Sequence, residues 1–187
     1  MIDSRPCSRE IMRKRSLRRF VPTKPQKIGA LSRVAYEMEQ IRDLLSTWPK
    51  EQSLQMNAWL EALLIHVRQL LDFFEHSKRF SMRGEENEDV LSVDYAFPAV
   101  LIQINATFRD RLNKDLAHIS YSYQQRVGAS KNWNLRDILP LLERCNEFAD
   151  HVCHNWTTEL PTEEVPRWES LAHTIGAALN QSKSCCI

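Results

Sequence analysis

Apolar residues recur at intervals of three and four along most of this chain, and that spacing limits what it can fold into. The strongest example follows Ser53, an expected N-cap, and predicts a helix with apolar residues on two sides. Its seam consists of Trp59, Leu60, Leu63, Leu64, Val67, Leu70, Leu71 and Phe74. The sequence has only 4 glycines, and no segment alternates apolar and polar residues long enough to predict a sheet. We therefore predict an all-α fold.

The same spacing predicts four more helices, which begin near Lys27, Phe97, Asn134 and Thr162. Pro49 is expected to end the first, and Pro98 fits the first turn of the second, where no N–H is needed. The second is expected to end near Tyr123, and the Asn134 side chain is expected to cap the third. Residues 81–95 and 124–133 are predicted to be loops. Five helices joined mostly by short polar connections describe a bundle.

The length of 187 residues suits one well-buried domain. We divide it into a basic arm (1–26), a helical bundle (27–180) and a short frayed tail (181–187). No apolar run approaches the ~20 residues that span a bilayer, so we expect no membrane partner. The odd count of 5 cysteines, with no recognisable secretory leader, favours free thiols in a reducing compartment and a cytoplasmic location.

Positive charge is concentrated at the start of the chain. Residues 1–27 hold nine Lys or Arg and two acidic residues, a net charge of +7, whereas the other 160 residues carry −6. A basic arm of this kind gains affinity for nucleic acids by releasing the counterions of phosphates. The expected contacts are Arg13, Arg15, Arg18 and Arg19. The alternative is a solvated leader, or a transit peptide, with no binding role.

The predicted helix after Phe97 carries a cation and an imidazole on one side. Arg111 and His118 are seven positions apart, and at roughly 100° per residue seven steps overshoot two turns by only about 20°. Lys114 falls on the same stripe. The opposite side is apolar and is formed by Ile104, Phe108, Leu112, Leu116, Ile119 and Tyr123. We expect the apolar side to hold this helix in the core and the polar side to stay exposed.

This stripe has the groups that cleave RNA without a metal ion. The reaction needs a base, an acid and positive charge over the phosphate oxygens. We assign His118 as general base or acid and Arg111 as phosphate clamp, with Lys114 and Asn113 as supporting residues. One imidazole is too few for two proton transfers, so a symmetric homodimer is expected to supply the second. No cofactor is expected.

An arginine, four to six intervening residues and a histidine on an interior bundle helix resembles the catalytic motif of the HEPN superfamily. Here six residues separate Arg111 from His118, and Leu112 stands where HEPN nucleases usually place a polar residue. Residues 66–74 and 113–118 also look like paired signatures of a group of bacterial helical proteins. The resemblance implies a metal-independent endoribonuclease or nucleotide-binding domain of a toxin–antitoxin or phage-defence system. RNA or a nucleotide, and a protein such as an antitoxin, are the implied partners.

The helix that carries the apolar seam also has polar residues beside it. Arg68 with Asp72, and Glu75 with Arg79, are spaced to form ion pairs one turn apart. His66 fits a structural role, in which a ring nitrogen bonds to a facing helix. In the alternative, His66 or Arg68 approaches the predicted catalytic stripe, and Arg68 then contacts nucleic acid. His118 has a structural alternative too, a hydrogen bond to a neighbour within the bundle.

A second polar face lies on the helix after Asn134. Glu147, His151 and His154 follow one another at i, i+4 and i+7, next to Cys153. This spacing can hold Zn²⁺ or ferrous iron if another helix supplies a further ligand. A solvated polar face explains the same residues, and no metal site is predicted.

Trp133 is the one tryptophan that falls outside the predicted apolar faces. With Arg126 and Lys131 nearby, it could form a small contact to nucleic acid. The alternative is a hydrophobic staple that anchors the start of the next helix. For the whole chain, the alternative to an RNA-directed protein is a non-catalytic helical module that binds a protein partner or a nucleotide.

Overall fold

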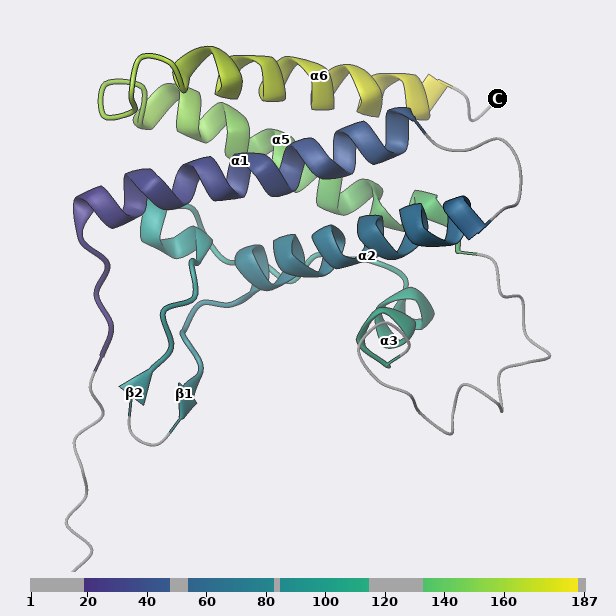
Figure 1. Ribbon diagram of the computed structural model, residues 1–187, viewed down its shortest axis with the longest axis horizontal. Helices are drawn as coiled ribbons and strands as arrows, with labels where there is room; N and C mark the ends of the chain where they lie inside the picture. Colours follow the sequence, from purple (N-terminus) through teal and green to yellow (C-terminus); the bar gives the residue numbers. More distant parts are fainter. Residues whose placement is uncertain (1–18, 48–53, 83–84, 115–132, 185–187) are drawn as a thin grey trace, which may run out of the picture.

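A computed structural model describes residues 19–47, 54–82, 85–114 and 133–184, whose helices form an all-α bundle (Figure 1). The helices are α1 (Lys24–Ser46), α2 (Leu54–Glu75), α3 (Ala106–Lys114), α5 (Leu139–Asn155) and α6 (Val165–Ser184). Two 3-10 turns cover Ser92–Tyr95 and Leu135–Ile138, and a minimal hairpin joins β1 (Ser81–Met82) to β2 (Glu85–Glu86). Among the described residues, no helix is long and apolar enough to cross a membrane.

The helices pack in layers around an aromatic core. α5 pairs with α6, and α1 packs against both α6 and α2, while α3 stands to one side below α2 (Figure 1). Phe148 of α5 is fully buried, and its ring lies 5.1 Å from the rings of Phe73 and Phe97, 5.8 Å from Tyr95 and 5.9 Å from Trp168. Each such pair adds about 0.5–1.5 kcal/mol beyond the area it buries. The seam predicted on α2 is buried as expected from Leu63 onward.

α1 begins three residues earlier than predicted. Thr23 is its N-cap, and a capping box joins Thr23 to Gln26: the Thr23 hydroxyl accepts the Gln26 N–H, and the Gln26 side chain accepts the Thr23 N–H. Pro25 lies inside the first turn, where a missing N–H leaves no bond unmade. Pro25, which precedes the predicted start near Lys27, therefore helps to start the helix.

The prediction of a helix from Phe97 is wrong for its first nine residues. Residues 97–105 have no regular secondary structure, and α3 begins at Ala106, after Asn105, whose side-chain oxygen accepts the N–H groups of Thr107 and Phe108. The backbone of this irregular stretch bonds to α2 where the Val100 N–H donates to the Phe74 carbonyl. Phe97 and Ile102 thus reach the core without helical geometry. The predicted helix end near Tyr123 lies outside the described residues.

The remaining helix boundaries lie closer to those predicted from the sequence. The Asn134 side chain caps the turn that leads into α5 by accepting the Arg136 N–H, as predicted. α6 begins at Val165, three residues after the predicted start at Thr162. The predicted loop over residues 81–95 contains the hairpin and a 3-10 turn, which ends at Ala96 with a left-handed φ of 58°.

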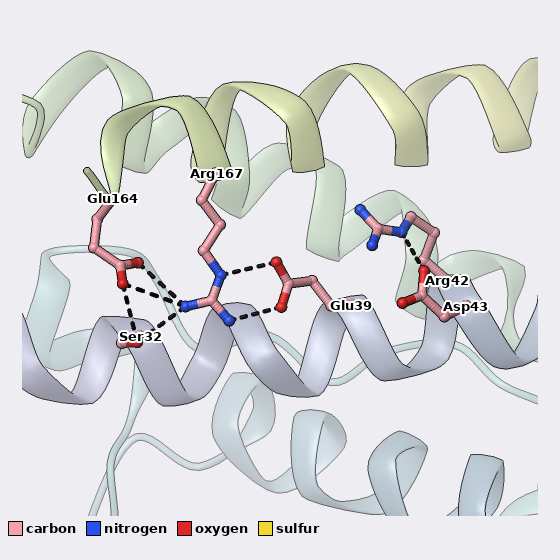
Figure 2. Close-up of polar contacts among 6 residues, drawn as sticks. All are labelled: Ser32, Glu39, Arg42, Asp43, Glu164 and Arg167. Carbon is pink, nitrogen blue, oxygen red and sulfur yellow. Dashed lines mark hydrogen bonds and ion pairs between the residues drawn. The ribbon is translucent and has the colours of Figure 1, made fainter. Parts of the chain in front are cut away.

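One arginine of α6 ties the last helix to the first (Figure 2). Arg167 makes two parallel bonds to Glu39 of α1, with Nε at 2.8 Å from Oε1 and Nη2 at 2.6 Å from Oε2. Its remaining nitrogen, Nη1, donates to Ser32 and Glu164. The hydrogen bonds that Arg167 donates to Glu39 are the main reason that the pKa of Arg167 is raised above its ordinary value. This geometry fixes how α6 lies on α1.

Candidate nucleic-acid interface

α3 separates its buried and exposed residues as the sequence predicts. Phe108 and Leu112 are buried in the core, whereas Asn113 and Lys114 are exposed and Arg111 is half-buried. Three of the four predicted catalytic residues therefore lie together near the C-terminal end of α3. The fourth, His118, lies outside the described residues, as do Arg13, Arg15, Arg18, Arg126 and Lys131.

Arg111 rests on the ring of Trp133. The centre of its guanidinium lies 4.0 Å from the ring centroid, and the Phe108 ring meets the same tryptophan edge to face at 5.0 Å and 82°. Trp133 packs against the core and directly precedes the Asn134 cap of the turn into α5. The guanidinium is therefore held between α3 and the start of α5. At a partly exposed position such a cation–π contact contributes about 0.5–1 kcal/mol.

Lys114 forms an ion pair with a neighbour on the same helix. Its Nζ lies 2.7 Å from Oδ1 of Asp110, and both side chains are about half exposed. An ion pair of this kind contributes about 0.2–0.5 kcal/mol, so a stronger anion can displace Asp110 at little cost.

α3 is fixed to α2 by a pair that the sequence did not indicate. Arg109 donates from both Nη atoms to the Glu75 carboxylate at 2.7 Å and also bonds to the Ile102 carbonyl. The hydrogen bond to Glu75 raises the pKa of Arg109 above its ordinary value. Arg79, the predicted partner of Glu75, instead binds Asp94 at 2.5 Å. The predicted pairing of Glu75 with Arg79 is therefore wrong.

The other predicted nucleic-acid contacts are not gathered around Arg111. Arg68 is half-buried on α2, and among the described residues no hydrogen bond, ion pair or ring contact joins it to Arg111. Arg68 acts on Asp72: burial raises the pKa of that carboxyl group, and His76 and Arg68 partly offset the rise. Arg19 is exposed and lines a hollow together with Glu86 of the hairpin, and Figure 1 shows the hairpin at the left of the fold and α3 toward the right.

His66 has the structural role that the sequence favoured. Its Nδ1 lies 2.5 Å from Oε2 of Glu37 on α1, and Glu37 is only 4% exposed. Arg33 Nη2 lies 2.8 Å from the other carboxylate oxygen. With the Gln69 amide turned so that its nitrogen faces Glu37, that nitrogen lies 3.0 and 2.9 Å from the two oxygens. The buried carboxylate thus has donors from both helices.

Sequence reasoning overlooked Glu37, although its position gave a signal. It follows Val34 by three residues and precedes Ile41 by four, so it occupies the apolar stripe of α1. A charged residue in such a stripe calls for a buried partner, because an unpaired charge in the core is strongly unfavourable.

The face around His151 is not arranged as a set of metal ligands. His151 Nε2 lies 2.8 Å from the Tyr95 carbonyl, and its Nδ1 lies 3.2 Å from the Asn155 amide nitrogen. His154 Nδ1 lies 2.6 Å from the Asp150 carbonyl, and Glu147 pairs with an arginine. Within the part of the chain that the structure describes, no three His, Cys, Asp or Glu side chains gather at metal-binding distances. These histidines serve the hydrogen bonding of α5.

No match to this chain was found among protein-family models, curated proteins or solved structures. The HEPN resemblance therefore stays an expectation from the motif residues of the sequence.

Proposed function

We propose that this protein is a HEPN-like, RNA-directed protein that cleaves RNA without a metal ion, with Arg111 as the phosphate clamp. The observation that carries the proposal is the placement of the Arg111 guanidinium on Trp133. Stacking covers a face of the guanidinium, whereas its N–H donors lie in the plane and point sideways. An arginine held in this way is suited to bind two oxygens of a phosphate. Asn113 and Lys114 follow it on the exposed end of α3.

His118 supplies the proton transfers in this proposal. The 2′ oxygen forms a bond to phosphorus as the bond from phosphorus to the 5′ oxygen breaks. One imidazole takes the proton of the 2′ hydroxyl, and an imidazolium donates a proton to the leaving 5′ oxygen. The two rings come from the two copies of a homodimer, whose mass in solution is then twice the 21.9 kDa of one chain.

The experiment is cleavage of a labelled single-stranded RNA in the presence of EDTA. We expect His118→Ala to lower the rate by about 10²–10⁴-fold, as for the loss of a general acid or base. Arg111→Ala is expected to lower it by about 10²–10³-fold, as for the loss of a group that stabilises transition-state charge. His173→Ala on α6, which is exposed, is the matched control and should retain full activity. Equal activity in the unmodified protein and the three variants, or no activity in any of them, would refute the proposal that this protein cleaves RNA.

A second function, binding without cleavage, is favoured by one observation. Leu112, the residue after Arg111, is 1% exposed and packs in the core, where HEPN nucleases have a polar residue. A protein that only binds RNA, a nucleotide or a protein partner should tolerate His118→Gln as long as it folds. RNA binding that persists in His118→Gln, together with no cleavage by the unmodified protein, would establish this second function.

A further inference from the structure

A hollow lies where the segment before α1 meets the hairpin. In Figure 1 the hairpin lies at the left of the fold and α3 toward the right. The hollow has a volume of about 440 Å³, and we call it the arm-root hollow. Its lining residues are Arg19, Ser77, Lys78, Arg79, Glu86 and Leu91. They come from three separate stretches of sequence.

The walls of the arm-root hollow are held by buried contacts. The Phe20 N–H donates to the Glu86 carboxylate at 3.1 Å, and the Arg79 guanidinium lies 5.1 Å from the Phe20 ring. Arg79 Nη2 bonds to Asp94 at 2.5 Å, and Arg79 Nε bonds to the Asp89 carbonyl at 3.0 Å. The side chains of Arg79 and Asp94 are only 9% and 10% exposed. The segment that leads out of the N-terminal arm is thus fixed to the hairpin.

Two cations at the hollow lack the partners that other cations have. Within the part of the chain that the structure describes, eight lysines and arginines are shown within ion-pair distance of a carboxylate: Lys24, Arg33, Arg42, Arg79, Arg109, Lys114, Arg144 and Arg167. Arg68 and Arg136 are not among these eight, but neither of them lines the hollow. Arg19 and Lys78 have no hydrogen bond or ion pair to any described residue, and both are exposed. Glu86, the carboxylate that lines the hollow, accepts the Phe20 N–H and keeps its negative charge, so Arg19 and Lys78 leave a net positive charge there. The hollow therefore offers two cations that have no protein partner among the described residues, with Ser77 also in its lining.

We propose that the arm-root hollow binds a backbone phosphate of RNA through Arg19 and Lys78. Arginine, lysine and hydroxyl donors are the groups that contact phosphate oxygens in protein–nucleic acid complexes. An extended polyanion fits better than a single phosphate, because the sequence continues from Arg19 into the basic arm with Arg18, Arg15, Lys14 and Arg13. This assignment rests on the proposed RNA binding, but its residues are distinct from those of α3.

The test is fluorescence anisotropy with a labelled single-stranded RNA 20-mer, over a series of KCl concentrations. The variants are Arg19→Gln, Lys78→Gln and the double variant of the full chain. Arg42→Gln is the matched control: it removes one positive charge from a residue of α1 that lies outside the basic arm and pairs with Asp43. Loss of one phosphate contact on a single strand lowers the salt slope by about 0.7, which corresponds to about a fourfold loss of affinity near 0.15 M salt. Both changes together should weaken binding about fifteenfold.

Affinities of both single variants within twofold of the control, with an unchanged salt slope, would overturn the assignment. A labelled poly-glutamate 20-mer distinguishes the other source of negative charge. If this peptide binds as tightly as RNA and loses affinity equally in the double variant, the hollow serves acidic proteins and the RNA assignment is wrong. Arg111→Ala separates this inference from the proposed function. If Arg111→Ala cleaves and binds RNA normally while Lys78→Gln binds RNA weakly, the assignment of the hollow is supported and the proposed role of Arg111 is wrong.

Discussion

Removal of the Glu37 carboxylate is expected to destabilise the protein more than any single surface change. Glu37 is 4% exposed and accepts from His66 at 2.5 Å and from Arg33 at 2.8 Å, with Gln69 at 2.9–3.0 Å. Removal of one partner of a buried pair costs about 3–5 kcal/mol, because donors remain without an acceptor. We therefore expect Glu37→Ala to lower the free energy of unfolding by about 3–4 kcal/mol. For a chain of this length that is a fall in Tm of roughly 6–16 °C.

Single substitutions of the residues that contact Glu37 show which contact accounts for this loss of stability. His66→Ala should cost about 2 kcal/mol, since Glu37 keeps its other donors. Arg33 is 65% exposed, and Arg33→Ala should cost less than about 1 kcal/mol. His173→Ala, an exposed histidine, should change stability by less than about 0.5 kcal/mol.

Urea unfolding of Glu37→Ala, His66→Ala and the double variant gives the coupling energy directly. Because the two side chains share a short hydrogen bond away from water, we expect a coupling of about 1.5–3 kcal/mol. Additive effects, with a coupling below about 0.5 kcal/mol, would show that the bond contributes little and that His66 matters only through its packing.

Two further predictions follow from shifted pKa values. Burial raises the pKa of Asp72 above 3.8, so its negative charge lowers stability at neutral pH and stops doing so once the pH falls below about 3.8, where both states are protonated. Urea unfolding of Asp72→Asn should therefore show a gain in stability at pH 7 that disappears near pH 3; a gain of equal size at both would contradict this cause. Cys145 is 1% exposed, and burial raises the pKa of its thiol, so it should resist iodoacetamide until the protein unfolds. Peptide mass spectrometry in buffer and in guanidinium checks this, and labelling of Cys145 as fast as Cys153 in buffer would refute it.

The sequence predicted which helices form and which of their faces are buried, because both follow from spacing within one segment. The core residues of α2 and α5, and the Asn134 cap, are of this kind. The irregular stretch 97–105 was missed because its apolar residues occur at helical spacing, while the Val100 N–H bonds to the end of α2. Periodicity reports where apolar residues recur and carries no information on a competing hydrogen-bond partner.

Long-range pairing accounts for the rest of what the sequence did not predict. Glu75 had an arginine one turn away, yet it binds Arg109, which is 34 residues away and donates two parallel bonds. The bidentate geometry is stronger than a single contact on one helix face. Arg19 was predicted as a nucleic-acid contact from local charge, but its neighbour Lys78 is 59 residues further along the chain. The structure gives the location of Arg111, while the position of His118 stays a prediction.

The bond between Arg167 and Glu39 has a consequence for how the protein is made. The two residues are 128 positions apart, and they join α1 to α6. Until α6 has left the ribosome, the apolar residues of α1 lack one of their covering surfaces. This part of the core therefore closes only after α6 has been synthesised, and a nascent chain that stalls before residue 165 exposes apolar surface of α1 to chaperones.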